Sequence, residues 1–210
     1  NFNKGVSNGF QFAGFSNFNY DQADGVLAAG FANFTNGKSL AVQLAGFANF
    51  CEDVEGVQAA GFTNVVKGNG KAIQLAGFTN ITMGEVNGVQ AAGFLNYSMK
   101  KMQNAQLAGF ANISTSDATG LQIAGFSNIA TGDMEGIQIS GFLNAAKKVN
   151  GLQLGFINIA DTIESGIPVG FLSIVRKGFR ELEVSFGEGL NTQAAFKIGN
   201  EHFDGTAGLV

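Results

Sequence analysis

The sequence predicts an all-β fold, a β-solenoid of about eleven coils of 15–16 residues, from three observations. A phrase, Gly-Phe-x-Asn, recurs every 14 to 16 residues, and such a fixed period indicates a repeat architecture. Most copies follow a lead-in of apolar-Gln-apolar-Ala, whose alternation is typical of a strand. The composition, with 31 Gly, one Pro and 21 Phe, is typical of many tight turns and one aromatic repeated position. The copies begin at Gly14, Gly30, Gly46, Gly61, Gly77, Gly93, Gly109, Gly125, Gly141, Gly155 and Gly170.

The chain divides into three parts by how well it keeps this period. Residues 1–13 hold a degenerate copy, and we interpret them as an N-terminal cap. Residues 14–174 hold the full copies, of which the last has Ser173 in place of Asn, and they are predicted to form the repeat solenoid. Residues 175–210 lack the period and are predicted to be a C-terminal β-hairpin segment.

Each repeat is predicted to contain two short strands with a corner near Ala-Gly, where the missing side chain permits a bend. The five to seven residues after the second strand vary and hold most of the charge, so we expect turns that face water. Gly is too frequent, and the apolar spacing too short, for a helical interpretation. A meander of β-hairpins, or a barrel built from them, is the alternative fold.

Stacking at about 4.8 Å would place identical residues above one another in ladders. We expect a Phe ladder to fill the core: Phe31, Phe47, Phe62, Phe78, Phe94, Phe110, Phe126 and Phe142. An Asn ladder, two residues further on, is expected to point inward as scaffolding: Asn33, Asn49, Asn64, Asn80, Asn96, Asn112, Asn128 and Asn144.

The lead-in Gln has the opposite parity to its apolar neighbours, so we expect it on an outer face. There it either keeps the sheet soluble or forms a row that binds a ligand. The residues of this candidate outer binding row are Gln43, Gln58, Gln74, Gln90, Gln106, Gln122 and Gln138.

The C-terminal segment contains two alternating stretches, residues 182–186 and 194–198, joined through a Gly-rich connection. They are predicted to pair as a hairpin. The hairpin either caps the open edge of the solenoid, which would otherwise invite edge-to-edge pairing, or begins a further β domain that continues beyond Val210.

Composition and motifs argue against several functions. The net charge is −4 with few Lys and Arg, whereas a nucleic-acid-binding protein would show a basic stripe. We expect no cofactor, no metal and no catalytic residue. Cys51 has acidic neighbours rather than an activating base, and His202 is the only histidine and has no placed partner. The acidic turns, which include Asp117 and Asp133, lack the Gly-Gly-x-Gly-x-Asp phrase of calcium-binding solenoids.

The repeat form Gly-apolar-Gln-apolar-(Ala)-Gly-Phe-x-Asn, as in residues 120–128, resembles the surface-repeat segments of Bacteroidetes outer-membrane proteins. The tail at residues 177–185 and 195–199 is similar to the junction that follows such repeats. The resemblance spans nearly the whole chain. It implies a location more than an activity: the outer membrane or cell surface of a Gram-negative bacterium, with more membrane-associated β structure downstream.

These observations favour a non-enzymatic, surface-exposed structural or interaction module of an outer-membrane-associated protein. The expected partners are proteins at the cell envelope, with membrane association through parts at or beyond the C-terminus. The alternative is a secreted adhesin or carbohydrate-binding solenoid that would bind a glycan along the Gln row. An enzyme would need paired carboxylates on one face, and the Asp and Glu residues lie in turns without an obvious partner.

Overall fold

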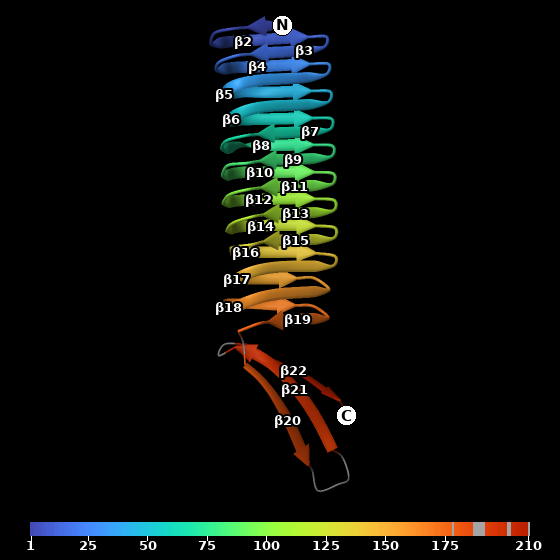
Figure 1. Ribbon diagram of the computed structural model, residues 1–210. Helices are drawn as coiled ribbons and strands as arrows, with labels where there is room; N and C mark the ends of the chain where they lie inside the picture. The colour runs from blue at the N-terminus through green and yellow to red at the C-terminus, as the bar shows by residue number, and fades with distance from the viewer. Residues whose placement is uncertain (178, 187–191, 201–202, 210) are drawn as a thin grey trace.

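The computed structural model describes residues 1–177, 179–186, 192–200 and 203–209, and their regular structure is entirely β. Nineteen strands stack in one column, with the N-terminus at one end (Figure 1). Every pairing within this column is parallel, for example Gln90 with Gln106 and Asn96 with Asn112. The predicted solenoid of about eleven coils is confirmed, and the hairpin meander or barrel is wrong because hairpins pair antiparallel strands.

The bounds of the nineteen strands follow the repeat. They are β1 (Phe2–Asn3), β2 (Ser7–Ala13), β3 (Ser16–Asn19), β4 (Ala23–Ala29), β5 (Ala32–Ala45), β6 (Ala48–Ala60), β7 (Thr63–Val66), β8 (Gly70–Ala76), β9 (Thr79–Thr82), β10 (Val86–Ala92), β11 (Leu95–Ser98), β12 (Met102–Ala108), β13 (Ala111–Ser114), β14 (Ala118–Ala124), β15 (Ser127–Ala130), β16 (Asp133–Ser140), β17 (Leu143–Leu154), β18 (Ile157–Val169) and β19 (Leu172–Val175).

A regular coil contains one long strand and one short strand. In the coil of β14 and β15, the lead-in forms the long strand, the pair Gly125–Phe126 forms the corner, and residues 131–132 lead into the next coil. In β5, β6, β17 and β18 the short strand continues through the turn into the following long strand. Register shifts between Thr35 and Lys38 and between Val149 and Asn150 accommodate the shorter repeats.

Two glycine positions are fixed by the close approach of stacked coils. At the corner, a Cβ on Gly109 would lie 2.1 Å from the carbonyl oxygen of Gly93. In the long strand, Gly120 has a φ of +110°, and a Cβ there would lie 2.2 Å from the carbonyl oxygen of Asn104. Asn104 occupies the same position one coil earlier with a φ of 87°, a conformation that Asn tolerates better than most residues.

The interior is narrow and only partly apolar. Near the turns it holds a stack of apolar side chains from successive coils: Val86, Met102, Ala118, Met134 and Val149. Near the corners it holds Ala, Ser, Asn and Gln side chains that are almost completely buried. Polar side chains therefore occupy much of the space that a larger apolar core would fill.

The N-terminal residues 1–13 join the same column rather than a separate unit. Strand β1 pairs with β3, and β2 pairs with β4, in the register of the later coils. Gln11 lies level with Leu27 and then Gln43, which is the Gln position of the repeat.

The C-terminal segment forms a three-stranded antiparallel sheet of β20 (Phe179–Phe186), β21 (Thr192–Asn200) and β22 (Phe203–Leu209). The predicted hairpin is present as β20 and β21, with Leu182 opposite Phe196. Within the described residues, no helix has the length and apolar character needed to cross a membrane.

Candidate interaction surface

A ladder of asparagines runs through the interior from one coil to the next. Asn112 shows the pattern: its Nδ2 donates to Oδ1 of Asn128 at 2.9 Å, to the carbonyl of Gln106 at 3.1 Å and to the carbonyl of Ile123 at 2.7 Å. Each amide therefore joins its own coil to the next coil through both side chain and backbone. The predicted ladder residues are fully buried: Asn33, Asn49, Asn64, Asn80, Asn96, Asn112, Asn128 and Asn144.

The glutamines form a second internal ladder, so the outer Gln row expected from the sequence is wrong. In the centre of the ladder, Nε2 of Gln106 donates to Oε1 of Gln90, and Nε2 of Gln122 donates to Oε1 of Gln106, each at 2.8 Å. The residues assigned to the outer row are buried to within 1% exposure: Gln43, Gln58, Gln74, Gln90, Gln106, Gln122 and Gln138.

The physical reason is that identical amides stacked at the strand spacing satisfy one another. A buried amide costs free energy only when it lacks hydrogen-bond partners, and the ladder supplies a donor and an acceptor at each coil. The apolar neighbours of each Gln, such as Leu121 and Ile123, then point outward. A signal for this was present in the sequence: the Gln is constant over the coils from Gln43 to Gln153, whereas its neighbours there vary among Val, Ile, Leu and Ala.

The two ladders run in opposite directions. Each Asn amide donates toward the C-terminal end of the column, as from Asn96 to Asn112. From Gln58 to Gln153, each Gln amide of the ladder donates toward the N-terminal end, as from Gln106 to Gln90. Their aligned side-chain dipoles therefore oppose one another, which avoids a large net dipole along the rod.

The Gln ladder ends where the sequence changes. At the C-terminal end, Gln153 lies level with Pro168, and its Oε1 is buried without a hydrogen-bond partner. At the N-terminal end, Gln43 lies level with Leu27, which is also buried. A leucine side chain therefore fits the Gln position sterically but cannot continue the ladder.

The phenylalanines do not fill the core; they form a stacked ladder on the corner edge of the rod. Neighbouring rings lie nearly parallel, with centroids 5.0 Å apart for Phe110 and Phe126 and 4.8 Å apart for Phe94 and Phe110. The interior between the two strands is filled by Asn and Gln, so the ring that follows the corner glycine projects outward. Each ring is buried by the rings above and below and remains about 40% exposed: Phe31, Phe47, Phe62, Phe78, Phe94, Phe110, Phe126 and Phe142.

The long strands present two apolar rows to solvent, and we call this surface the long-strand face. The valine row contains Val26, Val42, Val57, Ile73, Val89, Ala105, Leu121, Ile137, Leu152 and Ile167. The leucine row, nearer the corner, contains Ala28, Leu44, Ala59, Leu75, Ala91, Leu107, Ile123, Ile139, Leu154 and Val169.

An open groove of about 810 Å³ follows the leucine row beside the corner. Its lining includes Leu44, Ala59, Leu75, Ala91 and Leu107, together with the Ala-Gly pairs of the corners. The three leucines are 37–44% exposed. The groove is therefore a long, apolar and solvent-facing feature.

The short strands present one further apolar row, and we call this surface the short-strand face. It is aromatic at its N-terminal end and mostly aliphatic beyond it: Phe18, Phe34, Phe50, Val65, Ile81, Tyr97, Ile113, Ile129, Ala145, Ile159 and Ile174. Together with the corner Phe ladder, the two faces make an apolar surface that wraps around one edge of the rod.

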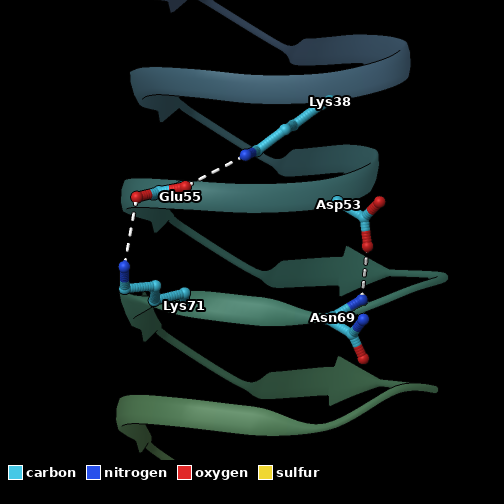
Figure 2. A network of polar contacts seen from close by, with 5 residues as sticks. All are labelled: Lys38, Asp53, Glu55, Asn69 and Lys71. Atoms are coloured by element: carbon cyan, nitrogen blue, oxygen red, sulfur yellow. Dashed lines mark hydrogen bonds and ion pairs between the residues drawn. The ribbon is translucent and has the colours of Figure 1, made fainter.

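The charged side chains of the solenoid, up to Lys177, lie along the opposite edge, in the turns and at the adjoining margin of the long-strand face. Figure 2 shows Glu55 between Lys38 and Lys71, with Nζ–Oε distances of 3.0 and 3.3 Å. Hydrogen bonds from the two lysines, with their positive charge, lower the pKa of the Glu55 carboxyl. These groups are well exposed, so we expect the ion pairs to contribute little to stability.

Acidic turn residues act as hydrogen-bond acceptors between coils. Oδ1 of Asp53 accepts a hydrogen bond from the backbone N–H of Asn69 at 2.6 Å (Figure 2). Oδ1 of Asp117 accepts one from the backbone N–H of Asp133 at 2.9 Å. In the described part of the chain, no group of three or more His, Cys, Asp or Glu side chains is placed to hold a metal ion.

Cys51 is buried in the interior, where Nε2 of Gln58 donates to its Sγ at 3.2 Å. Desolvation by burial raises the pKa of the thiol to about 12, and the charges of Asp53 and Glu52 act in the same direction. The thiol is therefore protonated at neutral pH and lacks the thiolate that a nucleophile needs. His202, the other side chain considered for chemistry, lies outside the described residues.

Comparisons with protein-family models, with curated proteins and with solved structures found no match to this chain.

Proposed function

We propose that this chain is a non-enzymatic structural and interaction module, exposed at the surface of an outer-membrane-associated protein of a Gram-negative bacterium. The observation that carries an interaction role is the placement of apolar side chains. They line both outer faces and the corner edge, whereas the amides that could keep a surface soluble lie inside. Contiguous exposed apolar surface marks interaction sites in soluble and surface proteins.

The repeat architecture supports the same proposal. Solenoids offer extended surfaces whose length grows with the number of coils, and their stability comes from contacts between neighbours. Here the Asn and Gln ladders hold the rod together from within. The outer rows are therefore free to vary, and they do vary among Val, Ile, Leu, Ala, Phe and Tyr.

The carbohydrate-binding alternative loses its main support. It relied on an outer Gln row, and the glutamines are buried. Sugars bind aromatic residues by stacking on ring faces, but the faces of the corner phenylalanines are turned toward one another, with centroids about 5 Å apart. The exposed parts of these rings are their edges. A protein partner therefore suits this surface better than a glycan does.

Labelling of intact cells tests the proposed location. Lys100 is exposed in a turn and Lys147 is exposed in β17, so a membrane-impermeant amine reagent should modify them in the native protein on whole cells. We expect labelled protein in the outer-membrane fraction, with a cytoplasmic protein left unlabelled as the control. Recovery of unlabelled protein in the soluble fraction of the lysate would contradict the proposal.

A further inference from the structure

The leucine row carries a size pattern that no other outer row shows. Over six successive coils its residues alternate between small and large: Ala28, Leu44, Ala59, Leu75, Ala91 and Leu107. The leucines stand out into solvent and the alanines leave gaps between them, and all of them except Ala28 line the groove beside the corner. A partner that fits this groove needs apolar projections at a spacing of two coils, which is about 10 Å.

A second copy of the same chain has projections at that spacing. When two rods pack face to face and run antiparallel, related by a two-fold axis that lies in the interface and is perpendicular to both rods, each row lies against its own copy in reverse order. Because the alternating stretch has an even number of members, reversal places every leucine opposite an alanine. The pairs are Ala28 with Leu107, Leu44 with Ala91, and Ala59 with Leu75.

We propose that the long-strand face is the interface of an antiparallel homodimer centred between the coils of Ala59 and Leu75. This inference rests on the proposed role as an interaction module and names the partner as a second copy of this chain. The size match resembles the interdigitation of facing sheets in a dry, tightly packed interface.

The charged margin of the face fits the same register. Glu55 and Lys71 belong to the two coils that flank the two-fold axis, so each lies opposite the other residue in the second copy. In one chain, Lys71 is 69% exposed and Glu55 is 43% exposed, which leaves both accessible to a partner (Figure 2). At the next coils outward, Leu40 lies opposite Asn87, and Asp24 lies opposite Gln103, so no like charges meet.

The valine row is compatible with the register because every pair it forms is apolar. Val57 lies opposite Ile73, Val42 opposite Val89, and Val26 opposite Ala105. One coil further at each end, the leucine row places Phe12 opposite Ile123; both are large, and this pair lies at the rim of the overlap, outside the alternating stretch.

The size of the overlap suits a stable dimer. Eight coils at about 4.8 Å, each with a seven-residue strand about 23 Å long, cover about 880 Å² on each copy. A standard specific interface buries about 800 Å² per partner. The leucine row continues beyond this overlap as Ile139, Leu154 and Val169, which lack the alternation.

The first test replaces two small residues of the leucine row with large ones. The double substitution Ala59→Leu and Ala91→Leu places a leucine opposite Leu75 and Leu44 of the second copy. The chain itself tolerates large residues on successive rungs of this row, since Ile123 and Ile139 are adjacent, so the fold should persist. Sedimentation velocity should show about 44 kDa for the wild type, and about a hundredfold weaker dimerisation for the variant.

The control is Ala145→Leu, which adds to the short-strand face the atoms that each of the two substitutions adds to the long-strand face. We expect it to dimerise as the wild type does. Circular dichroism of each variant verifies the strand content. A wild type that remains a 21.8 kDa monomer at all concentrations overturns the proposal. Dimers weakened by Ala145→Leu, but not by the double substitution, overturn it as well.

Cross-linking tests the register directly in a Cys51→Ser background. The pair Leu44→Cys and Ala91→Cys should yield a covalent dimer on oxidation, because each thiol faces the other position of the second copy. Within one chain these positions are three coils apart, about 14 Å, which is too far for a disulfide. Each single variant should stay uncrosslinked, and a covalent dimer of Leu44→Cys alone would overturn the antiparallel register.

The outcomes separate this inference from the proposed function. A monomer that binds phosphatidylcholine vesicles through the same face would overturn the dimer in favour of a lipid surface. The proposed surface location would then be decided only by the lysine labelling of intact cells. A dimer with the predicted cross-link, found in a protein that is not labelled on whole cells, would support the interface and contradict the location.

Discussion

Replacing Gln106 with Leu interrupts the Gln ladder at its centre. The change removes two hydrogen bonds, one to Oε1 of Gln90 and one from Nε2 of Gln122. Both partner atoms then remain buried without a partner. Each such atom costs about 1–3 kcal/mol, so the substitution should destabilise the fold by about 2–6 kcal/mol. Leu27 shows that a leucine fits the position, so overpacking should add little.

The double variant Gln106→Leu with Gln122→Leu gives the sharper result. It leaves Oε1 of Gln90 without a partner and Nε2 of Gln138 with only a long hydrogen bond, 3.5 Å, to the carbonyl oxygen of Ala145, and the bond between the two replaced residues no longer has either partner. The free energy of unfolding should therefore fall about as much as in the single variant, not twice as much. The end-of-ladder variant Gln153→Leu is the control, since it leaves only Oε1 of Gln138 unpaired.

Urea-induced unfolding followed by circular dichroism measures these differences. The expected order of stability is wild type, then Gln153→Leu, then the single and double central variants together. A double variant that loses twice the free energy of the single variant would refute the ladder as the source of the stabilisation. Equal losses of unfolding free energy for the central variants and for Gln153→Leu would refute it too.

Three further predictions follow from the interior and the corner. Phe110→Ala should lower the free energy of unfolding by about 2–3 kcal/mol rather than the roughly 3–5 kcal/mol of a fully buried ring, because the ring is 41% exposed. Urea unfolding measures this loss, and a loss below about 0.5 kcal/mol would contradict the stacking. Cys51 should resist iodoacetamide at pH 8 until the chain unfolds. Because its folded pKa of about 12 exceeds the ordinary 9.0, stability should fall as pH rises from 9 toward 12, and this loss should be absent in Cys51→Ser. Gly120→Ala should lower the melting temperature strongly, whereas Asn104→Gly should not lower it, since both positions have positive φ; equal effects would contradict the backbone geometry.

The fold was predictable from the sequence because the period acts at every coil. A fixed spacing of Gly-Phe-x-Asn requires identical residues to stack, and Asn96 above Asn112 is what stacking produces. The short repeats before Gly61 and Gly155 did not disturb the prediction, because register shifts near Lys38 and Val149 accommodate the change in length.

The direction of the faces was not predictable by the usual rule that apolar side chains point inward. That rule placed Phe110 inside and Gln106 outside, and the structure has both the other way. The rule fails because a ladder removes the cost of burying an amide, while the narrow interior excludes a ring. The alternation along one strand does not show which of its two faces is buried, since the pattern is the same in either case.

The candidate interaction surface was missed for the same reason. Once Gln74 points inward, Ile73 and Leu75 must point outward, and the apolar rows become the surface. The alternation of Leu and Ala from coil to coil is visible in the sequence, yet it has meaning only after the side chains of that row are known to face solvent.

The most direct test of the account is the exchange of glutamine side-chain amides with deuterium. In a sample labelled with ¹⁵N at glutamine, the Nε2 protons of the ladder residues should remain visible by NMR long after transfer to D₂O, because they are buried and hydrogen-bonded. Gln22, in the turn before β4, should exchange much faster and serves as the internal control. Immediate exchange of every glutamine side chain would contradict the interior ladder and the outward-facing apolar rows together.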